Sequence, residues 1–466
     1  MGTRYATYGL QFILLLLVAS RLGPYNYGIW GFITMLINYL YIINFGIANS
    51  TNVLIVQNKG KQTKINDYVK SSLYAISILI GILFLMMCLY GLYDSSLFNK
   101  YNIGYLFYII CIIAAFQYIN QLFSNICRAQ GRLLELSIFQ TSIPVAILIT
   151  TLFVKSNYLL YGLLYAYLIA HLLSFLFFLF RKGIPLNGKF SGEKLIYLVK
   201  KGFFLFLYNS SYTLIFTTTA SVISYYYTVE EYGHYSFSYN LGHSVMLILE
   251  AFVFLCFPKI VDQFYTGTKE KIKEVITSIR TNYVTFSHGL MYLAYSAFPF
   301  FIFLFPQYKN AIPALLLTAI SILLSTNSFG YNTLLISKNQ ERKVAIASGV
   351  SLLLNVIIGI IISLSGAPFY MVVLSMMASY ITFAFICAYY ANCLLNDKND
   401  FVSIFISIMP IPLLLPFVTA LIVPFCDTRL SILPLTVFIC LNMRSIKVII
   451  KTIQLIAVKP SVIDVK

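Results

Sequence analysis

Long apolar runs, separated by short breaks that carry almost all of the charge, constrain this chain more than any other feature. A helix needs about 20 predominantly apolar residues to cross the hydrocarbon core of a bilayer. The sequence therefore predicts an all-α integral membrane protein with about 14 transmembrane helices. The expected spans are 4–20, 28–48, 72–93, 103–125, 136–154, 158–180, 203–227, 236–258, 282–305, 311–335, 344–364, 369–394, 401–424 and 431–450.

The composition excludes the soluble classes of protein. Only 10% of the 466 residues are charged, whereas about a quarter are charged in a typical soluble domain. So few charges cannot cover a water-exposed surface, which excludes a secreted protein, a cytosolic enzyme and a disordered chain. The net charge of +17 does not indicate nucleic-acid binding, because no stretch is long and polar enough to form a basic aqueous domain. A strand-built barrel is also excluded, because its segments would be alternating decapeptides.

The positions of the basic residues predict the orientation of the chain. If the N-terminus is cytoplasmic, the cytoplasmic loops and ends hold 27 Lys and Arg, and the outer loops hold five. Cytoplasmic loops of membrane proteins are enriched in Lys and Arg. One missing or extra helix in the middle would move many of these Lys and Arg to the opposite side of the membrane and remove the asymmetry. We therefore expect an even number of spans with both termini in the cytoplasm.

Two short motifs recur in the same order and suggest an internal repeat. The Tyr27-Gly28 pair after the first span matches Tyr232-Gly233 after the seventh span, at an offset of 205 in the numbering. The segment 129–132 matches 339–342 at an offset of 210. Six spans are an even number, so both copies would enter the membrane in the same direction. We expect two six-helix lobes related by a pseudo-twofold axis along the membrane normal.

The repeat defines the expected domain limits. The N-terminal lobe would cover residues 1–180, a basic cytoplasmic linker 181–202, and the C-terminal lobe 203–395. Residues 396–466 would add two further spans and a basic cytoplasmic tail.

The segment 21–28, Arg-Leu-Gly-Pro-Tyr-Asn-Tyr-Gly, resembles the polysaccharide-transporter pattern R-x-L-G-P-x-x-[FY]-G with one residue fewer between Arg and Leu. Asn44-Phe45-Gly46-Ile47 resembles its D-L-G-L, with Asn in place of the acid. Residues 200–203 and 230–236 resemble two further motifs around the seventh span, x-K-G-x-P and E-x-x-G-x-Y-S. The Pro of x-K-G-x-P and an Asp in the seventh span, both often seen in such transporters, are absent here. Together these motifs resemble an O-antigen or capsule flippase of the multidrug/oligosaccharidyl-lipid/polysaccharide exporter superfamily.

This resemblance implies a function and a location. Such a protein would move undecaprenyl-diphosphate-linked oligosaccharide repeat units from the cytoplasmic to the outer face of the bacterial plasma (inner) membrane, by alternating access, for O-antigen or capsular polysaccharide. Its partners would be the lipid-linked oligosaccharide, the bilayer and other polysaccharide-assembly membrane proteins, and not nucleic acid. It would need no cofactor, with protons or sodium as candidate coupling ions.

Polar residues at helical spacing indicate which helix faces are wet, because polar side chains in a membrane helix are expensive unless they face protein or water. Packing between helices is the alternative explanation for the Ser and Thr stripes. The residues expected to line a substrate path are Arg4, Thr7, Tyr8, Gln11, Thr34, Asn38, Tyr41, Gln117, Asn120, Gln121, Ser124, Arg128, Ser210, Thr213, Thr217, Ser221, Ser224, Tyr239, Asn240, Thr318, Ser321, Ser325 and Asn332.

Glu250 is the only acid well inside a predicted span. Intramembrane carboxyls mark ion and proton pathways, so we expect Glu250 to couple transport to an ion, with His243 on the same helix face and His288 as a candidate partner. A protonated carboxyl that is satisfied by packing is the alternative. Arg4 and Arg128 are the candidates to hold a diphosphate, although each could be an ordinary interfacial anchor.

Three other functions compete with a flippase. A cation-coupled multidrug exporter would share the fold, but would need an acidic cavity. A multi-span glycan polymerase or acyltransferase would need a large external loop, and every predicted external loop is short. A passive channel would have no use for an internal repeat. We find no catalytic set and no metal-ligand spacing in the sequence, so we expect a transporter and not an enzyme.

Overall fold

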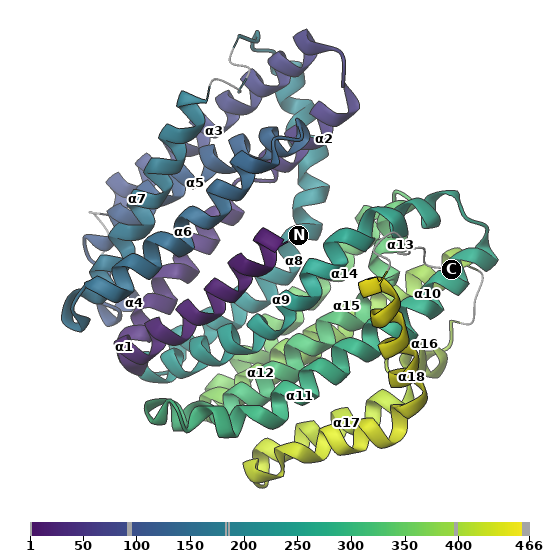
Figure 1. The fold of residues 1–466 in the computed structure, drawn as a ribbon. Helices are drawn as coiled ribbons and strands as arrows, with labels where there is room; N and C mark the ends of the chain where they lie inside the picture. The colour runs from purple at the N-terminus through teal and green to yellow at the C-terminus, as the bar shows by residue number, and fades with distance from the viewer. Residues whose placement is uncertain (1, 91–95, 182–183, 185–186, 396–398, 459–466) are drawn as a thin grey trace. The chain divides into compact units, whose positions relative to one another are not determined.

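The computed structural model describes residues 2–90, 96–181, 184, 187–395 and 399–458. Every regular element in these ranges is a helix (Figure 1). The chain divides into two compact units, one of residues 1–210 and 228–233, the other of residues 211–227 and 234–466. We call them unit 1 and unit 2. The boundary lies inside a continuous helix, and the domain limits expected from the sequence stay a prediction.

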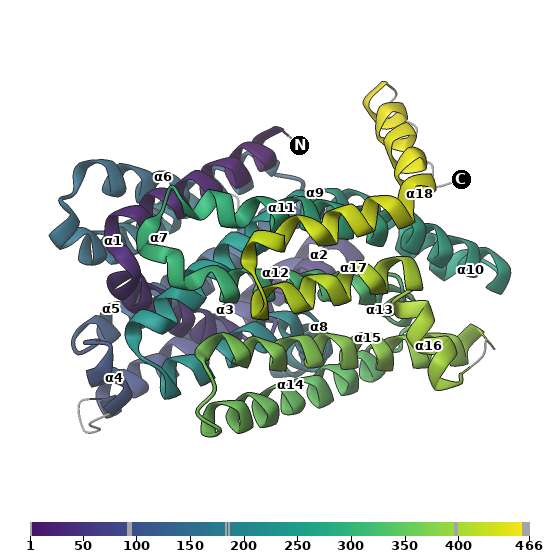
Figure 2. The same ribbon diagram turned by 90° about the horizontal axis from the view of Figure 1, so that it is seen from below.

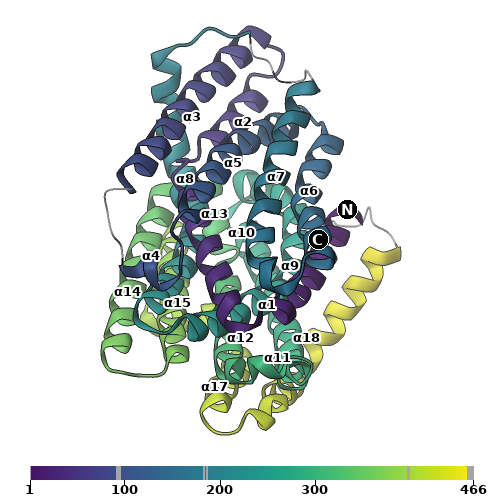
Figure 3. The same ribbon diagram turned by 90° about the vertical axis from the view of Figure 1, so that its left-hand side faces the viewer.

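Unit 1 consists of seven helices, a short 3₁₀ turn and the first part of an eighth helix. They are α1 (Gly2–Ile42), α2 (Ile47–Gln57), α3 (Gln62–Tyr90), α4 (Ser96–Lys100), α5 (Leu106–Ala129), α6 (Leu133–Phe153), η1 (Ser156–Tyr158), α7 (Leu159–Phe180) and α8 (Gly192–Tyr226). Helix α5 forms the centre of the unit and packs against α1, α2, α3, α6 and α7 (Figure 3).

Helix α1 contains a break that separates the first two predicted spans. Gly23 has φ 69° and ψ 170°, and Pro24 follows it. These angles are not helical, and proline cannot donate the hydrogen bond that would continue a helix through this point. The chain therefore changes direction where the sequence places the first break between apolar runs.

Helix α2 was not expected. The second predicted span ends at residue 48, but the structure ends that helix at Ile42 and turns at Asn44, whose Oδ1 accepts a 2.8 Å hydrogen bond from Gly46 N. Phe45 and Gly46 both have positive φ. The turn sends α2 back onto α5 and α3. This tertiary contact cannot be read from an apolar run.

Unit 2 contains the end of α8 and all later elements. They are α9 (Val229–Thr266, from His234), α10 (Lys269–Ser278), the π-helical turn η2 (Ile279–Val284), α11 (Thr285–Ile302), η3 (Pro306–Ala311), α12 (Ile312–Ser325), η4 (Thr326–Ser328), α13 (Tyr331–Ser337), α14 (Glu341–Leu364), η5 (Phe369–Val372), α15 (Val373–Leu395), α16 (Phe401–Ile408), α17 (Ile411–Ile422), η6 (Val423–Phe425), η7 (Thr428–Ile432) and α18 (Leu433–Val458). Helix α15 packs against α12, α13, α14 and α16.

The thirteenth predicted span is a broken helix. Helix α16 and the segment Ile411–Phe425 meet at an angle of 75°. Pro410 lies at the break, and a proline disfavours helical conformation in the residue before it. Helices α17 and α18 then run side by side (Figure 2). The Asn442 side chain donates a 2.8 Å hydrogen bond to the Pro412 carbonyl and so joins the two.

Within the described residues, nine helices are long and apolar enough to cross a membrane, or ten if the bent pair counts as one span. The protein is thus an all-α, multi-pass membrane protein. The expected count of fourteen is not confirmed. Part of the difference lies in α1, which counts as one span despite its break at Gly23. Helices α8, α9 and α11 overlap three more predicted spans but are not among the nine.

The two glycines of the repeat pack against each other inside unit 1. A Cβ atom on Gly28 would overlap the carbonyl oxygen of Val229, and a Cβ atom on Gly233 would overlap the carbonyl oxygen of Pro24. Pro24 precedes Gly28 by the same number of residues as Val229 precedes Gly233. The two contacts are therefore equivalent. Both motifs need glycine because backbone touches backbone.

The second repeated motif adopts one turn in both copies. Gly131 and Asn339 have φ of 75° and 54°. Arg132 N donates to Cys127 O at 2.9 Å, and Gln340 N donates to Leu335 O at 2.8 Å. This six-to-one bond with a left-handed residue is the Schellman helix end. The structure therefore makes Asn339 the counterpart of Gly131. The alignment of 129–132 with 339–342, which paired Gly131 with Glu341, is out of register.

Candidate functional site

Unit 1 presents polar side chains along the second half of α1 and the adjoining face of α5. Thr34, Asn38 and Tyr41 of α1 are half-buried, and so are Gln117 and Gln121 of α5. The Tyr41 and Gln121 side chains are hydrogen-bonded to each other. The Oε1 atoms of both glutamines are buried without a hydrogen-bond partner in the described part of the chain. Buried polar atoms normally have a partner, so these two oxygens have unused capacity to accept a hydrogen bond.

Two residues expected on the same wet face of α5 point elsewhere. Asn120 is fully buried, and its Nδ2 donates a 2.8 Å hydrogen bond to the His171 carbonyl of α7. Ser124 is buried and donates to the Gln121 carbonyl at 3.1 Å. These two side chains therefore belong to helix packing. Arg128, in the last turn of α5, is exposed.

The beginning of α1 carries the other predicted residues of unit 1. Thr7 is buried, Tyr8 is half-buried and Gln11 is exposed. The side chain of Arg4 lies outside the described residues. Its predicted contact with a diphosphate stays a prediction.

In unit 2, helix α9 carries an ordered row of polar groups. The Tyr239 ring stacks on Phe216 of α8, with centroids 3.4 Å apart, and on His243, with centroids 5.6 Å apart. His243 Nε2 lies 3.4 Å from Glu250 Oε1. The Glu250 side chain is 52% exposed, and Asn240 is also exposed. An exposed carboxyl on a membrane helix is unstable against lipid, so this face of α9 requires water beside it.

The structure does not pair Glu250 with His288, the candidate partner. His288 is fully buried, its Nε2 lies 3.1 Å from Asn327 Oδ1, and its Nδ1 lies 3.2 Å from the Tyr292 hydroxyl. Both ring nitrogens are therefore used inside unit 2. His243, two helical turns from Glu250, is the partner that the structure provides.

The hydroxyl stripes of α8 and α12 are mostly packed. Ser321, for example, is fully buried and donates to the Leu317 carbonyl of its own helix at 2.7 Å, and Ser221 donates to Thr217 O at 2.9 Å. This bonding to the preceding turn is usual for hydroxyl residues within helices. Burial favours the packing alternative for Ser210, Thr217, Ser224, Thr318, Ser321 and Asn332, and their place in a substrate path stays a prediction. Thr213, Ser221 and Ser325 are half-buried.

The sequence reasoning missed a polar group of unit 2. Arg280 was counted only as a loop charge, but its two Nη atoms donate to the carbonyl oxygens of Asn327 (3.1 Å) and Ile408. Its guanidinium also lies over the Tyr331 ring, 5.4 Å from the centroid. The available signal was its position two residues before the predicted span 282–305.

The comparison with known families decides the classification. Residues 1–264 match the model of the family described as "Polysaccharide biosynthesis protein". The chain belongs to this family. No curated protein matches the sequence.

Solved structures of membrane transporters share the fold of this chain. An inward-facing multidrug resistance MATE family transporter of the MOP superfamily matches with a TM-score of 0.66 at 15% identity, over 84% of this chain and 94% of the other. The lipid II flippase MurJ in an inward closed conformation matches with a TM-score of 0.63 at 14% identity, over 97% and 98%. A MOP superfamily transporter from Pyrococcus furiosus matches with a TM-score of 0.58 at 15% identity, over 84% and 93%. At these identities the likeness concerns the fold.

Proposed function

We propose that this protein moves an undecaprenyl-diphosphate-linked oligosaccharide from the cytoplasmic to the outer face of the bacterial plasma membrane by alternating access, for O-antigen or capsular polysaccharide. The family match over residues 1–264 is the observation that carries this proposal. The fold shared with the lipid II flippase MurJ supports it, because that protein is also a flippase. Both chain termini are proposed to lie in the cytoplasm, on the side that holds most of the Lys and Arg.

The polar groups described above suit a sugar. Tyrosine offers an apolar face together with a hydrogen-bonding tip, and Tyr41 and Tyr239 each lie among amide or imidazole groups. The unpartnered amide oxygens of Gln117 and Gln121 can accept hydrogen bonds from hydroxyl groups. Arg128 and Arg4 are proposed to hold the diphosphate. The Glu250–His243 pair is proposed to take up and release a proton during each cycle.

Export of a cationic drug, coupled to an ion, is the second candidate. The exposed carboxyl of Glu250 favours it, because a carboxylate would attract a cationic substrate, and the MATE transporter shares the fold. The unpartnered amide oxygens of unit 1 do not require a cation and fit a neutral sugar equally well. The two candidate functions differ in their substrate, and one set of complemented cells can distinguish them.

The test uses bacterial cells that lack a polysaccharide flippase and express this chain at matched membrane levels. We would measure surface glycan and the lipid-linked repeat units that remain on the cytoplasmic face, with repeat units of several structures. We expect the unaltered chain to restore surface glycan with at least one of them. Glu250→Gln should trap repeat units inside. Glu274→Gln is the matched control, because Glu274 lies exposed on α10 and pairs with Lys271 at 3.3 Å.

Failure with every repeat unit, together with resistance to cationic drugs that disappears in Glu250→Gln, would replace the flippase by the exporter. Restored surface glycan with full activity of Glu250→Gln would keep the flippase and remove Glu250 from the coupling mechanism.

A further inference from the structure

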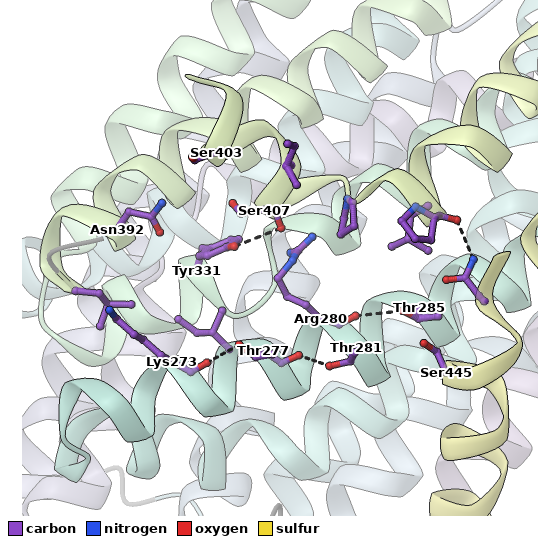
Figure 4. A pocket seen from close by; sticks show the side chains of 17 residues that line it. Lys273, Thr277, Arg280, Thr281, Thr285, Tyr331, Asn392, Ser403, Ser407 and Ser445 are labelled. Carbon is purple, nitrogen blue, oxygen red and sulfur yellow. Dashed lines mark hydrogen bonds between the residues drawn. The ribbon is translucent and has the colours of Figure 1, made fainter. Parts of the chain in front are cut away.

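Unit 2 contains a pocket of about 710 Å³, lined by two cations among apolar and hydroxyl side chains, that the proposed transport function does not use. One side is formed by α10 and the π-helical turn η2, and the other by the broken helix α16–α17, with α13, α15 and α18 completing the wall (Figure 4). Lys273, Thr277, Arg280 and Thr281 follow one face of α10 and η2 at helical spacing. The volume is within the range of small-molecule sites.

The charge of the lining is one-sided. Two of the 17 lining residues, Lys273 and Arg280, are cations, and none is acidic. The two acids of α10, Glu270 and Glu274, line the neighbouring groove, which Lys273 also lines, and Glu274 pairs with Lys271. Arg280 lines the pocket but not this groove, so it is the cation that lies away from both acids. The rest of the polar lining consists of Thr277, Thr281, Thr285, Tyr331, Asn392, Ser403, Ser407, Asn442 and Ser445. The side chains of Thr277, Thr281, Thr285, Tyr331, Ser407 and Asn442 already donate to backbone carbonyls, so the hydroxyls of Ser403 and Ser445 are the groups that can donate to an anion beside the two cations.

Arg280 is held in place with its charge uncompensated. Its two Nη atoms donate to the carbonyl oxygens of Asn327 and Ile408, and the Tyr331 ring covers one face of the guanidinium. Carbonyl groups orient the side chain but carry no net charge. Within the described residues no carboxylate forms an ion pair with it. A partly buried cation of this kind is stabilised by an anionic ligand.

The surroundings of the pocket indicate that the anion belongs to a lipid. Helix α16 contributes Ser403, Ile406 and Ser407 to the lining, while Phe401 and Val402 of the same helix are 70% and 62% exposed. These large apolar side chains need lipid acyl chains beside them. The pocket is lined by the end of α15, where Lys343 of α14 lies over the Tyr390 ring, and by α10, which carries Lys269 and Lys271 as well as Lys273. Basic pockets between membrane helices on the cytoplasmic side suit anionic lipid headgroups.

We propose that this pocket binds the phosphate of an anionic lipid headgroup through Arg280 and Lys273, while the acyl chains of that lipid lie against α16. The bound phosphate would join α10 and η2 to the broken helix. This site is independent of the transported substrate.

The test measures lipid binding to the purified full-length chain, stripped of lipid in a neutral detergent. Native mass spectrometry would compare phosphatidylglycerol with phosphatidylcholine at equal concentration. We expect preferential binding of phosphatidylglycerol, weakened about five-fold in Lys273→Gln, which is the effect of one basic residue near a membrane surface. Lys271→Gln is the matched control, because it removes the same charge from the same helix, and Lys271 does not line the pocket.

Equal binding of phosphatidylglycerol to Lys273→Gln and Lys271→Gln would overturn the proposal. A competition arm with inorganic phosphate distinguishes the two sources of the anion. If inorganic phosphate displaces phosphatidylglycerol from the unaltered chain but not from Lys273→Gln, the pocket is a free-phosphate site and the lipid assignment is wrong.

Arg280→Gln would remove the hydrogen bond to Ile408 and could unfold the broken helix. Arg280→Lys therefore serves as the second variant, because it keeps the charge but loses the planar fork. We expect it to bind phosphatidylglycerol about five-fold less tightly than the unaltered chain. Unchanged binding would remove Arg280 from the site.

Discussion

At the scale of single residues, the two Tyr-Gly motifs of this chain are sites of close backbone packing. Gly28 and Gly233 allow two helix turns to touch. Arg21, in the same motif as Gly28, donates from its Nη atoms to the carbonyl oxygens of Thr151 and Val154 (2.7 Å for the latter), at the C-terminal end of α6. The motif thus has a structural explanation in unit 1, apart from any contact with substrate.

Gly28→Ala should destabilise the protein strongly. The new methyl group would overlap the Val229 carbonyl, which belongs to a helix turn and cannot move aside as a side chain does. We expect a loss of about 3 kcal/mol or more in unfolding free energy, seen as a lower thermal unfolding midpoint in detergent. Gly349→Ala is the control, because nothing lies within 4 Å of the atom added there. Equal midpoints for the two variants would contradict the packing described.

Arg21→Gln should also destabilise unit 1. The last carbonyls of a helix have no partner in their own helix, and Arg21 supplies one for α6. Loss of these charged donors should cost about 2 kcal/mol, measured again as the thermal midpoint. Lys155→Gln removes an exposed charge from the loop that follows α6 and should leave the midpoint unchanged. A larger effect at Lys155 than at Arg21 would argue against the capping role.

At the scale of helices, side-chain caps and prolines set the ends of several elements. Thr228 and Glu231 form a reciprocal pair at the start of α9: Glu231 Oε2 accepts from Thr228 N at 2.9 Å, and Thr228 Oγ1 accepts from Glu231 N at 3.2 Å. This arrangement is the capping box. It fixes the turn that brings Gly233 to Gly28.

Thr228→Ala and Glu231→Ala should each cost about 1 kcal/mol of unfolding free energy. Because the two residues cap one helix end together, the double variant should cost little more than either single one. Thermal unfolding of the four proteins in the same detergent measures this coupling. Strictly additive losses would show that the two side chains act independently.

The sequence predicts the helices better than the contacts of their side chains. The apolar runs and the repeated Tyr-Gly motif follow from local chemistry and the need to cross a bilayer. The helical wheel of α5 places Asn120 beside Gln117 and Gln121, but it cannot show that α7 lies opposite Asn120. Likewise, Glu250 has His243 and His288 as plausible partners in sequence. Only the packing of η4 against His288, through Asn327, decides between them.

At the scale of the whole molecule, the distribution of Lys and Arg predicts which helix ends face the cytoplasm. Lys155 follows α6, and Lys271 lies on α10. The division of Lys and Arg between the loops predicts that these two residues lie on opposite sides of the membrane, with Lys155 outside. Both side chains are exposed, so both positions are open to labelling.

In a background from which the eight cysteines have been removed, Lys155→Cys should react with a membrane-impermeant maleimide in intact cells. Lys271→Cys should react only after the membrane is permeabilised, because the positive-inside rule places α10 in the cytoplasm. Labelled fractions on gels measure both. The reverse pattern would invert the proposed topology, and the direction of transport with it.

The reciprocal glycine contact also bears on biosynthesis. Residues 228–233 complete unit 1, yet the segment just before them, 211–227, belongs to unit 2. A ribosome that has released the chain only as far as Ser210 has therefore not yet supplied the turn that covers Pro24 and Gly28. Until that turn emerges, the helices already inserted in the membrane expose the surface around Pro24 and Gly28 to insertion factors or to proteases. Ribosome pausing or truncation shortly before Thr228 should leave an N-terminal fragment that is degraded quickly.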